Sequence, residues 1–107
     1  MDFQRLRNIT TGRLHTEIGH VYEDLEYLTG QLGIMTHNLP NAIQAILPIL
    51  KKRAVISSQF WDEEYSPKHN GEIEIAPLSL DEITEFWENY NALPHPFSKI
   101  GSSKSEA

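Results

Sequence analysis

Cysteine is absent from the 107 residues, which excludes a disulfide framework, a cysteine nucleophile, an iron–sulfur cluster and cysteine-ligated zinc. Long apolar runs are also absent. No stretch approaches the roughly 20 residues that a membrane helix needs, and the polar N-terminus does not resemble a signal peptide. We therefore expect a soluble intracellular domain with no membrane partner. The length predicts a single globular domain over residues 1–98, and the small polar residues 99–107 predict a disordered tail.

Basic residues are scarce in the second half of the chain. The whole sequence carries 15 acidic and 9 basic side chains, but residues 62–90 hold nine acids and a single base. Because affinity for DNA and RNA comes largely from Lys and Arg at phosphates, no direct contact with nucleic acid is expected here. Two interpretations of the acidic half stay open. It is either a face that binds a basic protein surface or a solvated surface that keeps the protein soluble.

Helix signals dominate the first half. Asp2 can cap a short helix that ends near Gly12, and a second helix is expected over residues 20–28 with Gly30 as its stop. A third, almost wholly apolar helix begins at Pro40. An interior proline removes a backbone hydrogen bond, so Pro48 predicts a kink or break near residues 44–47. The cations at 51–53 then suit the C-terminal end of this helix.

The pattern changes after residue 54. Residues 55–61 are β-branched and aromatic, residues 66–71 are turn-like, and residues 72–75 alternate with period two, which predicts a β-hairpin. Ser79 and Glu82 form a capping box for a final amphipathic helix that ends by residue 92. The predicted fold class is α+β and mostly α: three short N-terminal helices, a small hairpin and a C-terminal amphipathic helix. We expect Leu80, Ile83, Trp87 and Tyr90 to form one buried stripe on that helix, with Phe86 beside it.

No catalytic constellation is recognisable. The sequence has no Gly-flanked serine, phosphate loop or dinucleotide fingerprint. His15 and His20 superficially resemble a zinc helix, but the two ligands should be four residues apart, and Gly19 interrupts the segment. We therefore expect no enzyme activity, no metal and no cofactor.

Polar residues cluster in the first half more densely than helix packing requires. One interpretation is structural, with hydroxyls that cap helices and His37 bonded to a loop carbonyl. The other is a ligand pocket between helices formed by Thr11, Tyr22 and His37.

Three segments carry a resemblance to a known family. They read Thr-Thr-Gly-x-Leu at residues 10–14, Gly-x-Val-Tyr-x-x-Leu-x-x-Leu-Thr-Gly at residues 19–30, and Thr-His-Asn-Leu-Pro-x-Ala at residues 36–42. In these segments the chain resembles a family of short phage- and prophage-encoded proteins of unassigned function. Asn38 and Asn41 depart from the Gln and Arg of many relatives. The resemblance implies a viral or mobile-element origin and a place in the cytoplasm of a bacterial host, but no chemistry.

The leading hypothesis is a stoichiometric binder that blocks a host protein, such as a nucleic-acid-handling defence complex, in the manner of an anti-CRISPR inhibitor. An acidic face with an aromatic anchor would make the contact, and its candidate residues are Trp61 (or Phe60 as the anchor), Asp62, Glu63, Glu64, Glu85 and Glu88. The second hypothesis is a module that sequesters a small nucleotide-like signal. The third is a helix-turn-helix regulator, for which no basic recognition helix is present. A homodimer stays open.

Overall fold

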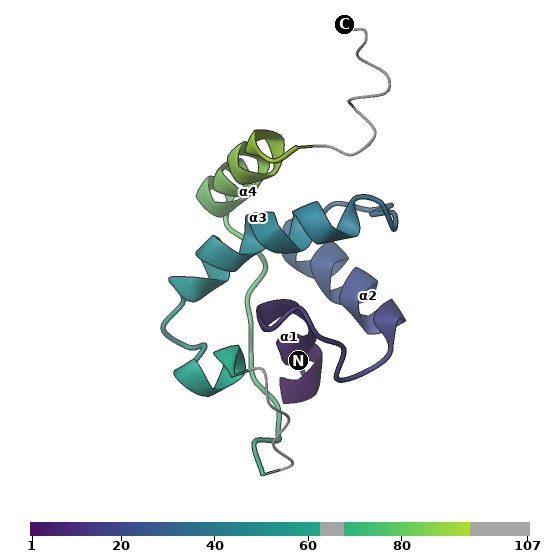
Figure 1. The fold of residues 1–107 in the computed structure, drawn as a ribbon. Helices are drawn as coiled ribbons and strands as arrows, with labels where there is room; N and C mark the ends of the chain where they lie inside the picture. Colours follow the sequence, from purple (N-terminus) through teal and green to yellow (C-terminus); the bar gives the residue numbers. More distant parts are fainter. Residues whose placement is uncertain (63–67, 95–107) are drawn as a thin grey trace, which may run out of the picture.

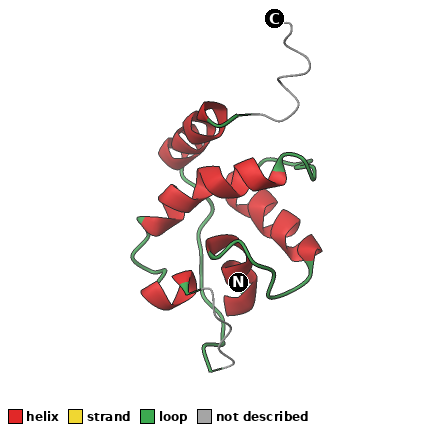
Figure 2. Cartoon of the chain, viewed as in Figure 1, coloured by secondary structure: helices red, strands yellow, loops and turns green. Residues whose placement is uncertain are grey.

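The computed structural model describes residues 1–62 and 68–94, and its regular elements are helical throughout (Figures 1 and 2). Four α-helices and one short 3-10 helix follow one another along the chain, and no strand occurs within the described residues. They are α1 (Phe3–Thr10), α2 (Ile18–Thr29), α3 (Leu39–Lys51), η1 (Ser58–Trp61) and α4 (Leu80–Ala92). The predicted α+β class is therefore wrong, and the fold is all-α.

The predicted caps explain where the helices begin and end. The Asp2 carboxylate accepts a hydrogen bond from the Gln4 backbone N–H at 2.8 Å and starts α1. Gly30 ends α2 in the left-handed conformation (φ 70°), which costs glycine little. Ser79 and Glu82 form the predicted capping box of α4. These signals are local in the sequence, and all three are confirmed.

Helix α3 lies at the centre of the fold and runs through Pro48 without the predicted break. It contacts α1 on one side and α4 on another (Figure 1). Its apolar side chains join those of α1 and α2 in one buried core, whose members from α3 are Ala42, Ala45, Ile46, Ile49 and Leu50. A helix that is apolar on several sides is best satisfied in such a central position.

The predicted hairpin is replaced by a 3-10 turn and an extended segment. Within residues 55–61 the chain forms η1, and Phe60 is buried against Phe3 with ring centroids 4.9 Å apart. Phe60 is thus a core residue and not the exposed anchor considered above. Residues 72–75 alternate as predicted, with Ile75 buried and Glu74 exposed, but their neighbours are helices. Period two reports an extended backbone with one buried face and does not say what covers it.

We call the extended segment 71–78 the strap, because it fastens the first two helices to α4 (Figure 1). The Phe3 N–H donates to the Gly71 carbonyl at 3.0 Å, and the Ile73 N–H donates to the Met1 carbonyl at 2.8 Å. Further along, the Leu78 N–H donates to the Leu28 carbonyl at the end of α2 (2.8 Å). The strap is therefore hydrogen-bonded to the first residues of the chain and to the end of α2, with one isolated bridge between Asp2 and Glu72.

Candidate functional site

Helix α4 packs antiparallel to α3, and two ion pairs hold its first half in place. Arg53 donates to both carboxylate oxygens of Glu82, at 2.6 and 3.2 Å, and Lys52 reaches Glu85 at 2.8 Å. The hydrogen bonds from the Arg53 side chain hold the pKa of the Glu82 carboxyl below its usual value. The cations at 51–53 were expected at the end of α3, but their role in fixing α4 was not.

Amides from α3 hold the second half of α4. The Asn38 amide donates to the Tyr90 hydroxyl at 2.8 Å, and the Asn41 amide donates to the Pro94 carbonyl at 3.0 Å. From α4, the Asn89 amide donates to the Ala45 carbonyl at 3.0 Å. Both ends of α4 are therefore fixed on α3.

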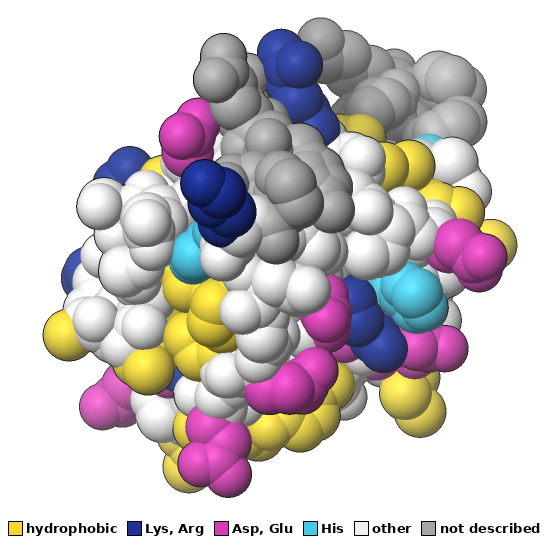
Figure 3. All heavy atoms as spheres, turned by 90° about the horizontal axis from the view of Figure 1, so that it is seen from below, with side chains coloured by type: hydrophobic (Ala, Val, Ile, Leu, Met, Phe, Trp, Pro, Cys, Tyr) yellow, Lys and Arg dark blue, Asp and Glu magenta, His cyan; other side chains and the backbone are white. Residues whose placement is uncertain are grey.

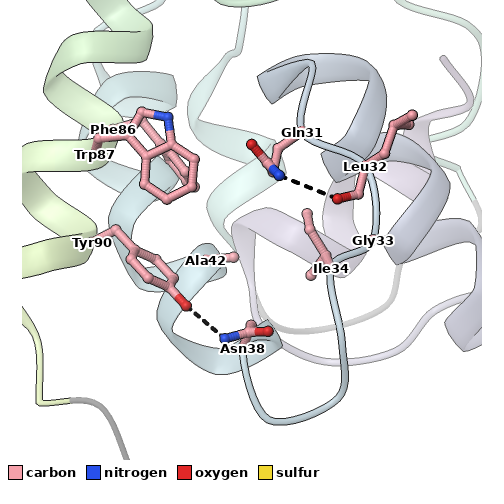
Figure 4. Close-up of a pocket in the computed structure, with 9 residues that line it drawn as sticks. All are labelled: Gln31, Leu32, Gly33, Ile34, Asn38, Ala42, Phe86, Trp87 and Tyr90. Carbon is pink, nitrogen blue, oxygen red and sulfur yellow. Dashed lines mark hydrogen bonds between the residues drawn. The ribbon is translucent and has the colours of Figure 1, made fainter. Parts of the chain in front are cut away.

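A cavity of about 190 Å³ opens between α4, the start of α3 and the loop that follows α2 (Figure 4). We call it the α4 cleft. Its lining residues come from these three elements and are Gln31, Leu32, Gly33, Ile34, Asn38, Ala42, Phe86, Trp87 and Tyr90. None of them carries a charge, and one wall consists of three aromatic rings.

The aromatic wall follows from the register of α4. Phe86 is buried in the core, while Trp87 and Tyr90 are half-buried at its edge. The Trp87 and Tyr90 ring centroids lie 5.4 Å apart in an edge-to-face arrangement. At 3.6 residues per turn, Leu80 lies only about 20° from Trp87 around the helix, as the predicted stripe requires, but it is the first residue of α4. Its side chain is 84% exposed, so Leu80 does not belong to the predicted buried stripe.

The loop wall is apolar and unusually open. Leu32 is 76% exposed and Met35, a few residues on, is 59% exposed. Gly33 adopts a left-handed conformation (φ 77°), and its N–H donates to the Glu26 carboxylate at 3.2 Å. An acidic side chain of α2 is thereby held beside the cleft.

The predicted acidic-face residues lie on two separate elements. Trp61 and Asp62 are at η1, which packs on α1, whereas Glu85 and Glu88 are on α4. Glu85 is paired with Lys52 and Glu88 is exposed. Glu63 and Glu64 lie outside the described residues. Acidic side chains are also spread over the face turned away from α4, interspersed with apolar ones (Figure 3).

Trp61 is half-buried and lies beside a cation of its own chain. The Lys51 ammonium is 4.5 Å from the centroid of its ring. Trp61 also lines a shallow hollow along the outer face of α3, together with Leu47 and Pro48.

The predicted pocket residues lie at the end of α1 (Thr11), within α2 (Tyr22) and just before α3 (His37). The Thr11 hydroxyl donates to the Arg7 carbonyl at 2.6 Å. The Tyr22 hydroxyl donates to Thr36 at 3.3 Å, next to the exposed His37. Thr11, Tyr22 and His37 lie outside the α4 cleft. Their neighbours do meet, because Gly12, Leu39, Pro40, Ile43 and Gln44 line a cavity of about 260 Å³.

A family model described as a domain of unknown function, DUF7736, matches residues 1–54, just over half of the chain. The chain belongs to the DUF7736 family. No curated protein and no solved structure matches it. The DUF7736 segment contains α1, α2 and α3, so the α4 cleft combines a loop and a helix start from that segment with an aromatic wall from beyond it.

Within residues 1–62 and 68–94, no three or more His, Asp or Glu side chains are grouped in a way that could hold a metal ion. In the same part of the chain, no helix has the length and apolar character needed to cross a membrane.

The sequence patterns predict the three aromatic residues of the cleft only as part of a packed helix face, and they do not identify Gln31, Leu32 and Asn38 as site residues. One signal for the cleft is nevertheless present in the sequence. Three aromatic residues within five positions of one helix are more than a helix lying at the edge of a small core can bury completely. The contact of Asn38 with Tyr90, 52 residues away, has no counterpart in the sequence pattern.

Proposed function

We propose that this DUF7736 chain acts by stoichiometric binding to a protein and not by turnover of a substrate, and that the α4 cleft with its surroundings is the contact surface. The observation that carries the proposal is the exposed Leu32 beside the half-buried Trp87 and Tyr90. Aromatic side chains that are half-buried beside a small cavity are typical centres of protein interfaces. Because the Leu32 side chain is 76% exposed, packing in the core does not account for an apolar residue at this position.

The charge around the cleft supports a basic partner. Glu26 is held against the loop wall, and Glu88 adds a negative charge on the solvent-exposed side of α4. The net charge of −6 adds a long-range attraction for positively charged surfaces. With the resemblance to phage and prophage proteins, the proposal extends to a bacterial host protein that handles nucleic acid, blocked by this chain.

The second candidate, a nucleotide-like ligand, finds less support in the α4 cleft. Its lining includes no Lys or Arg to balance a phosphate. Its volume of about 190 Å³ is also below the roughly 300–1,000 Å³ of ordinary small-molecule pockets. We therefore do not extend the proposal to such a ligand.

Affinity capture from bacterial lysate with matched charge variants tests the proposal. Glu88→Lys reverses an exposed charge on α4, the helix that carries the aromatic wall, and Glu74→Lys makes the same change on the strap, outside the cleft lining. We expect one host protein to be retained by the wild type and by Glu74→Lys, at a fixed molar ratio that decreases in high salt. Glu88→Lys should lose it. Equal retention by both variants would contradict a contact at α4.

A further inference from the structure

We propose that the α4 cleft holds the guanidinium side chain of an arginine that the protein partner contributes. This inference rests on the proposed function, because it names the group that the bound protein would insert. The cleft has room for one side chain: its volume of about 190 Å³ is less than that of pockets that enclose whole metabolites. Its lining then decides which side chain fits.

The lining offers two amide oxygens to an incoming group. The Gln31 amide nitrogen donates to the Leu32 carbonyl at 3.2 Å, and the Asn38 amide nitrogen donates to the Tyr90 hydroxyl at 2.8 Å. One N–H of each amide is therefore used within the wall, and Gln31 Oε1 and Asn38 Oδ1 can accept from an incoming group. In Figure 4 the Gln31 oxygen is turned toward the side of the aromatic residues. A ligand rich in donors suits this arrangement, and guanidinium carries five N–H groups.

The aromatic wall favours a flat cation. Trp87 and Tyr90 present ring surfaces whose negative quadrupoles attract positive charge within about 6 Å. A planar guanidinium can stack on indole, which a tetrahedral ammonium cannot do. The same chain already pairs a cation with its other tryptophan, since the Lys51 ammonium lies 4.5 Å from the Trp61 ring centroid.

The charges around the cleft also favour a positively charged ligand. No residue of the lining carries a positive charge that would repel a cation. The Glu26 carboxylate lies at the loop wall, 3.2 Å from the Gly33 nitrogen, so a negative charge is held beside the lining. An arginine stem would meanwhile cover the exposed Leu32 side chain.

Titration of the full chain with butylguanidinium tests the inference without any partner. The chain has two tryptophans, one in the cleft and one outside it, so their indole N–H signals in NMR spectra act as site and internal control. We expect the Trp87 signal to shift and saturate, and the Trp61 signal to stay in place. N-butylacetamide, a neutral compound of similar length, should move neither signal. Equal shifts with both compounds, or equal shifts of both indoles, would overturn the inference.

Variants identify the groups that hold the cation. Trp87→Leu should abolish the shift of the Gly33 amide signal that butylguanidinium causes, and Trp61→Leu should retain it. Gln31→Leu changes an exposed loop residue, so it leaves the core intact while it removes the acceptor, and it should weaken binding. Glu26→Gln keeps an acceptor for the Gly33 N–H while it removes the negative charge at the loop wall, and it should weaken binding about two- to fivefold at low salt, as expected for an ion pair near the surface. Unchanged affinity in Gln31→Leu and Glu26→Gln together would contradict the assignment.

The arginine inference and the proposed function can fail independently of each other. If a host protein binds at a fixed ratio and loses binding with Glu88→Lys, but butylguanidinium leaves Trp87 unchanged, the partner uses another group and only the arginine inference fails. If butylguanidinium saturates the cleft while no host protein is retained, the cation site stands and the proposed function fails.

Discussion

Arg7, the most deeply buried cation among residues 1–62 and 68–94, lies against His69 and affects its protonation. Its Nη2 donates to the Asp62 carbonyl at 2.7 Å, and its Nη1 lies 3.3 Å from Nδ1 of His69. Because a guanidinium only donates, Nδ1 must accept, and the ring is neutral with its proton on Nε2. The His69 ring also packs against Phe3 and Phe60, with ring centroids 4.8 Å and 4.6 Å away. Burial and then the Arg7 charge lower the pKa of His69.

A pH dependence of stability follows from this neutral histidine. The pKa of His69 is lower in the folded chain than its usual 6.5, so the unfolded chain binds more protons near that pH. Stability should therefore decrease as the pH falls from about 7.5 through 6.5. Burial lowers the pKa of His15 as well, which adds to the same slope. We expect thermal unfolding of His69→Gln to show a smaller dependence on pH between 7.5 and 6.5 than that of the wild type.

The ion pair between Arg5 and Asp24 links α1 to α2. Arg5 donates to both carboxylate oxygens, at 3.0 and 2.8 Å, and the Asp24 side chain is only 9% exposed. Arg5→Met leaves this carboxylate poorly solvated and should lower the free energy of unfolding by about 1–2 kcal/mol. Glu23→Gln removes the exposed partner of the same arginine and should cost less than about 0.5 kcal/mol. Urea unfolding measures both, and equal losses would show that the Asp24 contact has no special weight.

At the scale of elements, the sequence predicts where helices begin and end, but it does not predict which segments pack against them. Asp2, Gly30 and the Ser79 capping box are short-range signals, so the ends of three helices could be predicted closely. The strap could not be assigned correctly, because Ile75 alternates as a strand residue does while its carbonyl accepts from the Tyr27 hydroxyl of α2. The α4 cleft depends on contacts across more than 50 residues, which periodicity does not encode.

The capping box of α4 gives a prediction at this scale. Ser79 accepts from the Glu82 N–H at 3.2 Å, and Glu82 returns a bond to the Ser79 N–H at 2.9 Å. Ser79→Ala should lower the free energy of unfolding by about 1 kcal/mol. Ser57 precedes η1 in the same way but has no side-chain cap bond, so Ser57→Ala is the matched control and should be nearly neutral. A loss of similar size in both would mean that the serine bond at α4 is not the cause.

At the scale of the whole molecule, the DUF7736 segment and the remaining residues share one core. Phe60, Leu78 and Phe86 lie beyond residue 54 and are buried in the same cluster as the helices of the segment. Their removal would expose the apolar faces of α1, α2 and α3 that they cover. The segment therefore does not contain all of the hydrophobic surface that its helices need.

We predict that a fragment of residues 1–54 does not fold alone. Its amide NMR spectrum should show the narrow dispersion of an unfolded chain, while residues 1–94 should show the wide dispersion of a folded one. The reason is the loss of the five core residues Ile56, Phe60, Ile75, Leu78 and Phe86, each worth about 1.5–3 kcal/mol when buried. A cooperative thermal transition in the short fragment would contradict this.

The strap gives the cleft an influence on helices that a partner never touches. It is anchored on α1 through Phe3 and on α2 through Leu28, and it leads directly into α4. Detachment of the strap would leave α4 held on α3 alone, so occupancy of the cleft and the attachment of the first two helices are linked in one thermodynamic cycle. A bound partner should therefore slow amide hydrogen exchange in α1, on the opposite side of α3.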